Sequence, residues 1–327
     1  MRRLGWVAVV IGIVVAVGTG VSWRAHVDGA ASLTPLTFML DWFPNPDHVP
    51  LYAAIGEGYF TQAGLRITLQ VPANADDPLK LAAVGRVDVA VNYEPNVILA
   101  RAQGLPVRSI GLLVGQPLTT VMFLRSSGIR SPKDLVGRHV GFAVTGFADA
   151  MMDQVMHSDG ASKANLKMVN VGFDLVPALL SHKVDAVVGA YRNVERVQIE
   201  MQGQTVGMFE PEKYGVPSFY ELVLIANDRT VASRPAVLRR FVQAVGRGIA
   251  FTEAHPAEAF RQYVREAHDP KLNDAFNRRS FQATLPYFAR TQAQLSSRWE
   301  DFNLWLAAQK VIPRPVPVNQ LYTNLTP

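Results

Sequence analysis

Short apolar runs alternate with helix-like segments along the first third of the chain. Residues 36–40 form an apolar run, and a helix is expected to begin near residue 49. Three further strands are predicted at residues 66–71, 87–91 and 107–114. The helical segments between them end at glycines, which is typical of helix C-termini. This strand–helix–strand order predicts a parallel sheet with right-handed crossovers.

The same order restarts near residue 119. An extended run at 119–125 precedes strands at 139–144, 166–169 and 185–190, with helices predicted at 148–157, 174–182 and again around 191–195. Further strand signals lie at 205–209 and 220–226, and the chain is helical from residue 228 to about 310.

This pattern predicts an α/β protein with two lobes, each a mostly parallel sheet flanked by helices, followed by a helical C-terminal segment. We assign residues 32–118 and 225–327 to lobe 1 and residues 119–224 to lobe 2. The helical C-terminal segment is expected to pack back on lobe 1. A cleft between two such lobes is a favoured ligand site, and hinge closure around it is a known binding mode.

The first 31 residues have the pattern of an export signal. Arg2 and Arg3 precede an uncharged stretch at residues 4–21, and small residues at 29–31 suit cleavage before Ser32. A retained membrane anchor is the alternative, because this stretch would reach roughly 27 Å as a helix. We therefore expect a periplasmic protein that contacts the membrane only through this signal or anchor.

Composition narrows the classes of function. The hydrophobic fraction of 49% supports a folded core, and the net charge of +5 is not concentrated in any Lys/Arg cluster, so we expect no nucleic-acid partner. The chain has no cysteine, which excludes disulfides and thiolate chemistry. Its seven histidines show no metal-ligand spacing, and phosphate-loop and hydrolase motifs are absent. We expect no metal, no cofactor and no enzyme activity.

Polar and aromatic residues follow the predicted strands, where open α/β sheets place ligands. In the stretch LDWFPNPDHVPLYAAIGEGYF, residues 40–60, Trp42 and Asn45 are candidate ligand contacts. Trp42 could instead be a core residue. Asp47 is interpreted as a helix cap, and His48 is left open between cap support and ligand contact.

Further candidates follow later strands. Tyr93 could stack on a planar ring and Glu94 could accept hydrogen bonds from ring amines, although an ordinary turn would explain both. Tyr191 and Glu195 are four residues apart and are predicted to share one helix face, with a solvated face as the alternative. The remaining candidate ligand contacts are Thr145, Gly146 and Phe147 at a predicted helix N-terminus, Asn193, and Tyr220 beside Glu221.

Several segments together resemble one known family. They are LDWFPNPDHVPLYAAIGEGYF, VDVAVNYEPNVILARAQGLPV, GRHVGFAVTGF, DAVVGAYRNVERVQIE and YELVLIANDR. They resemble the substrate-binding proteins of ABC importers for thiamine pyrimidine precursors, a family related to fungal thiamine pyrimidine synthase. The likeness spans roughly residues 36–267. It implies a type II periplasmic-binding-protein fold, with a planar heterocycle held by Trp42, Tyr93, Tyr191, Glu195 and Tyr220.

The chain departs from the synthase at the residues that the synthase needs. Asn92 and Asn96 stand where the synthase has its cofactor-binding lysine and its consumed histidine, and VPSFY at 216–220 replaces its cysteine-rich stretch. A Schiff base to pyridoxal phosphate requires that lysine. The synthase hypothesis is therefore weaker than the binding-protein hypothesis.

The resemblance and the residues lead to one main hypothesis. The chain is expected to be a monomeric periplasmic binding protein that delivers a small planar heterocycle to ABC permease subunits. Formylaminopyrimidine and hydroxymethylpyrimidine are the expected ligands. The alternatives are a synthase-like enzyme, a binding protein for another heterocycle such as riboflavin, and a membrane-tethered sensor.

Overall fold

The computed structural model describes residues 32–325, so the expected export signal or anchor at residues 1–31 lies outside the described part of the chain. Residues 33 onward form one compact unit. Within residues 32–325, no helix is long and apolar enough to cross a membrane.

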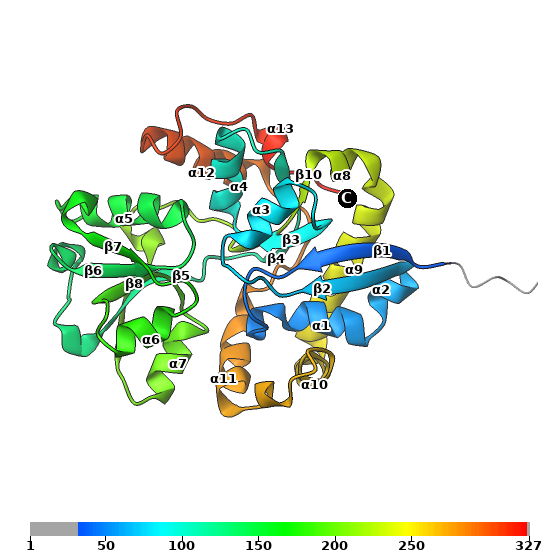
Figure 1. Ribbon diagram of the computed structural model, residues 1–327, viewed down its shortest axis with the longest axis horizontal. Helices are drawn as coiled ribbons and strands as arrows, with labels where there is room; N and C mark the ends of the chain where they lie inside the picture. Colours follow the sequence, from blue (N-terminus) through cyan, green and yellow to red (C-terminus); the bar gives the residue numbers. More distant parts are fainter. Residues whose placement is uncertain (1–31, 326–327) are drawn as a thin grey trace, which may run out of the picture. The chain divides into compact units, whose positions relative to one another are not determined.

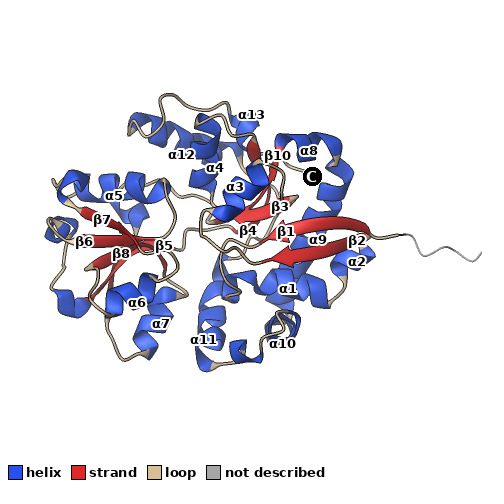
Figure 2. Cartoon of the chain, in the orientation of Figure 1, coloured by secondary structure: helices blue, strands red, loops and turns tan. Residues whose placement is uncertain are grey.

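Within residues 32–325, ten strands form two sheets, and most of these strands are labelled in Figures 1 and 2. The first sheet has the order β2-β1-β3-β10-β4. Its strands are β1 (Thr34–Met39), β2 (Leu65–Gln70), β3 (Val89–Asn92), β4 (Val107–Val114) and β10 (Leu222–Asn227). Strand β1 runs parallel to β2 and β3, whereas β10 is antiparallel to β3 and β4.

The second sheet repeats this arrangement with the order β7-β6-β8-β5-β9. Its strands are β5 (Thr119–Leu124), β6 (His139–Phe142), β7 (Lys167–Asn170), β8 (Ala186–Tyr191) and β9 (Val206–Phe209). Strand β6 is parallel to β7 and β8, and β5 is antiparallel to β8 and β9. The predicted fold class is confirmed. Each sheet is mixed, because β5 and β10 run against their neighbours.

Helices cover both sheets. Those between strands of the first sheet are α1 (Val49–Gly56), α2 (Tyr59–Gln62), α3 (Asp77–Ala83) and α4 (Glu94–Ala102). Those of the second sheet are α5 (Phe147–His157), α6 (Leu175–Leu180) and α7 (Glu195–Met201). The helices after β10 are α8 (Asp228–Ser233), α9 (Pro235–Ala254), α10 (Pro256–Glu266), α11 (Ala275–Thr284), α12 (Ser296–Ala308) and α13 (Val318–Leu321).

The long helix α9 packs on the first sheet and on α1, as expected of the C-terminal segment. Pro235 suits the first helical position, where its missing N–H has no intrahelical partner. Buried residues then recur every three or four positions and form one apolar face. Phe241 on this face lies 5.0 Å from the ring of Phe38 in β1 and stacks on Phe60 at 5.4 Å.

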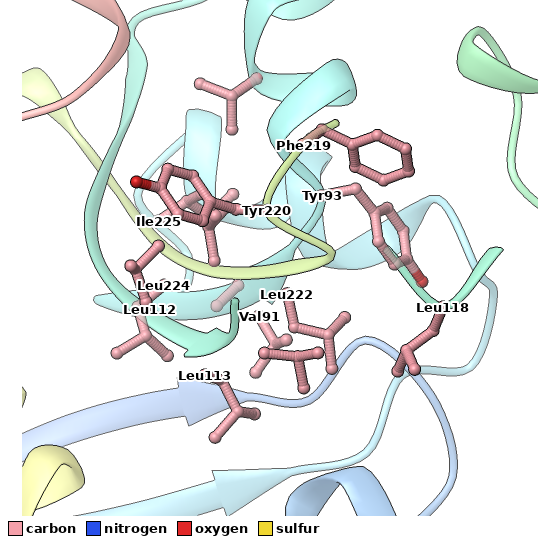
Figure 3. Close-up of a cluster of buried hydrophobic side chains, with 14 of the residues drawn as sticks. Val91, Tyr93, Leu112, Leu113, Leu118, Phe219, Tyr220, Leu222, Leu224 and Ile225 are labelled. Carbon is pink, nitrogen blue, oxygen red and sulfur yellow. The ribbon is translucent and has the colours of Figure 1, made fainter. Parts of the chain in front are cut away.

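Strand register brings the predicted site residues to two edges. Strands β1 and β3 are parallel neighbours, with Met39 opposite Ala90, so the residues that follow both strands emerge at the same edge of the first sheet. In the second sheet Thr119, which begins β5, lies opposite Tyr191, which ends β8. The buried cluster in Figure 3 is built largely on strands β3, β4 and β10 of the first sheet and also includes Tyr93 and Leu118.

Candidate ligand-binding site

A pocket is lined by residues that follow strands of both sheets. Its empty space is about 700 Å³, including the part open to solvent, which is within the range of small-molecule sites. The part associated with the first sheet contributes Asp41, Trp42, Asn45, Asp47, Tyr93, Asn96 and Glu221. The part associated with the second contributes Thr119, Ala143, Val144, Phe147, Ala148, Met151, Leu175, Val188, Gly189, Tyr191, Val194 and Glu195.

Aromatic side chains form much of the lining. Trp42 follows β1, and its ring meets Phe173, from the segment after β7, edge to face at 4.4 Å. Phe147 begins α5 and packs against Phe219 at 5.2 Å. Tyr93 and Tyr191 complete the set. These rings offer faces on which a planar heterocycle can stack.

Asp41 holds Tyr93 in place. The Tyr93 hydroxyl donates to Asp41 Oδ2 at 3.0 Å, and His48 Nε2 lies 2.8 Å from Asp41 Oδ1. The Asn45 backbone N–H donates to His48 Nδ1, so the ring proton is on Nε2 and points to Asp41. His48 is fully buried and outside the lining, so its observed contacts support Asp41.

Glu221 is anchored to the start of β5. Its carboxylate accepts the backbone N–H groups of Leu118 and Thr119 at 2.5 and 2.8 Å and the Thr119 hydroxyl at 2.7 Å. Burial raises the pKa of Glu221, which these bonds partly offset. Its acceptor capacity is therefore largely used by the crossover strand.

Glu195 keeps one oxygen free of other residues. It begins α7, and Oε2 accepts the Tyr191 backbone N–H at 2.7 Å. No other residue of the described chain donates to Oε1. Burial, with repulsion from Asp41 and Glu221, raises the Glu195 pKa to about 7. Glu195 can therefore present an acceptor to a ligand at neutral pH.

Asn96 is a second polar group available to a ligand. It lies in the first turn of α4 and is 5% exposed. Its Oδ1 is buried, and among the described residues it has no hydrogen-bond partner. Because buried amides are normally satisfied, a ligand atom would complete this group.

The pocket is acidic. Asp41, Asp47, Glu195 and Glu221 line it, whereas the residues assigned to the lining include no lysine or arginine. Burial raises the pKa of the Tyr93 and Tyr191 hydroxyls, which stay protonated. Such a site favours hydrogen-bond donors and cations and disfavours phosphate or sulfonate groups.

Six of the predicted contacts line the pocket, namely Trp42, Asn45, Tyr93, Phe147, Tyr191 and Glu195. The structure places Glu94, Thr145, Gly146, Asn193 and Tyr220 outside the lining. Each of these five has another structural environment.

Glu94 and Tyr220 are part of the structure behind the pocket. Glu94 is fully buried, and its Oε2 accepts the Tyr220 backbone N–H at 2.6 Å. The Tyr220 hydroxyl accepts the Leu295 N–H at 3.0 Å, and its ring lies 4.5 Å from the Arg298 guanidinium. Figure 3 shows the Tyr220 and Tyr93 rings pointing in opposite directions.

The remaining three have structural roles outside the lining. Thr145 donates through its backbone N–H and its hydroxyl to Asp76, in the segment before α3. Gly146 caps α5 with a φ of 96°, a conformation that favours glycine. Asn193 donates from Nδ2 to Asp47 Oδ1 at 2.6 Å.

Two local predictions were wrong. Tyr191 ends β8 and Glu195 begins α7, so they do not share a helix face, although the Tyr191 N–H contacts the Glu195 carboxylate. Asp47 is not the helix cap: Asn45 caps the 3-10 turn η1 (Pro46–His48) by accepting the Asp47 N–H at 2.9 Å. Asn45 and Asp47 are both polar residues that commonly cap helices, so the sequence alone does not show which of them is the cap.

Sequence reasoning missed several lining residues. Asp41 lies two residues after the end of β1, and Thr119 begins the extended run at the crossover, so strand-end position could have indicated both. Glu221 and Asn96 are next to or near residues that were chosen. The small and apolar residues of the lining, such as Gly189 and Met151, carry no chemical signal in the sequence.

The two mixed sheets and the strand-end pocket define a periplasmic-binding-protein fold. The alkanesulfonate-binding protein of Xanthomonas axonopodis pv. citri has a similar structure, with a TM-score of 0.70 and 15% identity. The similarity covers 89% of this chain and 98% of that protein. At this identity the likeness concerns the fold.

Sequence comparison identifies the family. Residues 45–259 match the family described as NMT1/THI5 like, and the chain belongs to it. A formylaminopyrimidine-binding protein of Halalkalibacterium halodurans is 33% identical over 302 residues, covering 90% of this chain and 91% of the relative. A 4-amino-5-hydroxymethyl-2-methylpyrimidine phosphate synthase of Legionella pneumophila is 28% identical over 292 residues, covering 88% and 91%. The predicted family is confirmed.

Proposed function

We propose that this protein is an exported substrate-binding protein of an ABC importer and captures an aminopyrimidine precursor of thiamine. The acidic, aromatic pocket with no basic side chain in its lining carries this proposal. The formylaminopyrimidine-binding relative supports the choice of ligand class.

The ligand chemistry follows from the two groups with available polar atoms. An aminopyrimidine presents an exocyclic amine beside a ring nitrogen, and Glu195 Oε1 can accept from such a donor. Asn96 Oδ1 can accept a hydrogen bond from the N–H of a formylamino group or from a hydroxymethyl O–H. Trp42, Tyr93 and Tyr191 supply the aromatic contacts, as the sequence predicted.

The two sheets serve as the cores of two lobes that close around this ligand. Hydrogen bonds already connect their residues at Asp76–Thr145 and at Asp47–Asn193. A closed pair of lobes would exclude water from the ligand and present a defined surface to the permease subunits. Delivery from the periplasm by a monomer remains part of this proposal.

A synthase activity is the second candidate, because relatives bear that name. Pyridoxal phosphate, the cofactor that this activity implies, does not fit the residues present. The pocket lining includes no lysine for a Schiff base and no basic group to pair with the phosphate. We therefore favour binding over catalysis.

A thermal-shift panel tests the proposed function. Aminopyrimidines should raise the melting temperature of the purified protein in a concentration-dependent manner, because they bind the folded state. Riboflavin, an alkanesulfonate and pyridoxal phosphate serve as comparison compounds. A shift with one of these and none with aminopyrimidines would refute the proposed ligand class.

A further inference from the structure

A buried polar group joins the two walls of the pocket. Asp47, in η1, lines the pocket beside the first sheet, and Asn193 lies between β8 and α7 of the second. Asn193 Nδ2 is 2.6 Å from Asp47 Oδ1 and 2.7 Å from Thr284 Oγ1 at the end of α11. All three residues are buried, with exposures of 1% or less.

Each partner of this bond also has an unpaired oxygen. Within the described chain, neither Asp47 Oδ2 nor Asn193 Oδ1 has a hydrogen-bond partner, and both are buried. Two buried acceptors left unsatisfied on a directly bonded pair are unfavourable. One proton would satisfy both, if Asp47 carried it on Oδ2 and donated it to Asn193 Oδ1.

The neighbouring bonds fix which groups donate and which accept at the Asn193 amide. The Thr284 hydroxyl donates to the Ser280 carbonyl oxygen at 2.8 Å, so its oxygen accepts from Asn193. Both protons of Asn193 Nδ2 are then used, one by Thr284 and one by Asp47. The amide oxygen, which is buried without a partner among the described residues, can only accept.

We propose that Asp47 is a neutral carboxylic acid that forms a cyclic acid–amide pair with Asn193, and that this pair holds the two walls of the pocket together. Asp47 and Asn193 are thus positioning residues for ligand binding. The inference rests on the proposed function, because the ligand lies between the two walls.

The charged surroundings agree with a neutral Asp47. Burial raises its pKa well above the ordinary value, the hydrogen bond from Asn193 lowers it in part, and the nearby carboxylates raise it. The titratable groups around it are Asp41, Glu195, Glu221, Tyr191, Tyr263 and His48. On α11, which packs against η1, the charged groups are Arg278 and Arg279, which bond to Asn273 and Glu200.

The pair makes closure sensitive to pH. Ionising Asp47 removes the proton between the two oxygens, so a carboxylate oxygen then faces the Asn193 carbonyl. The resulting repulsion favours separation of the walls. Affinity for ligand should therefore fall as pH rises through the pKa of Asp47 in the closed state.

Calorimetric titration with formylaminopyrimidine between pH 6 and 9 tests this. We expect the wild type to lose at least tenfold in affinity on the alkaline side. Asp47→Asn should lose this alkaline fall, because an amide donates to Asn193 at every pH. Asn193→Leu should weaken binding at least tenfold.

Asp76→Asn is the matched control, since Asp76 also links the two parts of the chain but is not in the pocket lining. It should keep the wild-type pH profile. An alkaline fall of equal size in Asp47→Asn would overturn the proposal. If Asn193→Leu does not fold, the pH profile of the isosteric Asp47→Asn variant still tests the proposal.

Infrared spectroscopy separates this proposal from the proposed function. The wild type minus Asp47→Asn difference spectrum at neutral pH should contain the carbonyl band of a protonated carboxylic acid. We expect it with or without formylaminopyrimidine. A carboxylate band alone would overturn the proposal, whereas absence of pyrimidine binding with the protonated band present would overturn only the proposed ligand.

Discussion

At the scale of single residues, the carboxyl groups of the pocket differ in how many of their oxygens already have hydrogen-bond partners. Asp41 is occupied by His48 and Tyr93, and Glu221 by the start of β5. Glu195 alone among the four combines a place in the lining with an oxygen that accepts no hydrogen bond from another described residue and that is not buried. Glu195 is therefore the residue that we expect to select ring amines.

Replacing Glu195 should weaken ligand binding strongly. A hydrogen bond to a charged group contributes about 1.5–3 kcal/mol, so Glu195→Gln should lower aminopyrimidine affinity roughly 10- to 150-fold. Calorimetric titration measures this. Glu253→Gln, on α9, is a control outside the lining and should bind like the wild type. Unchanged affinity in Glu195→Gln would remove this residue from the site.

The same carboxyl group predicts a pH dependence. Its pKa of about 7 means that it is neutral in acid and becomes an anion, the better acceptor, as pH rises. In the Asp47→Asn background, affinity for a ligand that does not itself titrate should rise through about pH 7 and then level off. Adding Glu195→Gln should flatten that profile. A profile that falls over the same range would contradict the assignment.

Glu94 predicts a pH effect on stability. Burial raises its pKa to about 8, so ionisation opposes folding as pH rises from the unfolded-state value towards 8. Wild-type protein should therefore lose melting temperature between pH 6 and 8.5. Glu94→Gln should reduce that loss, and equal losses in both proteins would show that Glu94 does not titrate in this way.

At the scale of elements, helices α9 and α1, which pack beside the first sheet, approach each other closely at one glycine. A Cβ at Gly248 of α9 would lie 2.3 Å from the Pro50 carbonyl oxygen and 2.8 Å from Ala54 Cβ in α1. Gly246, half a turn earlier, has no atom nearer than 3.4 Å. Of these two positions, only 248 requires glycine for packing.

This pair gives a matched test. Gly248→Ala should lower the free energy of unfolding by about 1–3 kcal/mol, because overpacking outweighs the helix propensity gain. Gly246→Ala should raise it by about 0.5–1 kcal/mol, since alanine restricts the unfolded chain and Gln292 can adjust. Denaturant unfolding measures both. Equal effects would contradict the close contact between α9 and α1.

Elements were more predictable from sequence than the site. Strand β4 at Val107–Val114 coincides with its predicted range because a continuous apolar run marks it clearly. For Tyr191 the sequence favours a helix, since nothing local separates a strand end from a helix start there. Trp42 and Glu195 are predictable because they follow strands, whereas Glu94 is adjacent to Tyr93 but points elsewhere. The direction of a side chain depends on packing between distant segments, such as Glu94 with Tyr220.

At the scale of the molecule, the fold brings together strand ends that are distant in sequence, and function depends on the charge that collects there. Four carboxyl groups and several aromatic rings meet in one pocket, with no basic residue in the lining. The same fold in an alkanesulfonate-binding protein serves an anion. The residues of the lining, and not the fold, are therefore the basis for the proposed ligand class.

The most direct test of this claim is calorimetric titration of the purified full-length protein with formylaminopyrimidine, alongside a phosphorylated aminopyrimidine. We predict saturable one-to-one binding of the unphosphorylated compound and at least tenfold weaker binding of the phosphate ester, which the acidic lining repels. Tighter binding of the phosphate ester, or binding of neither compound, would contradict the account.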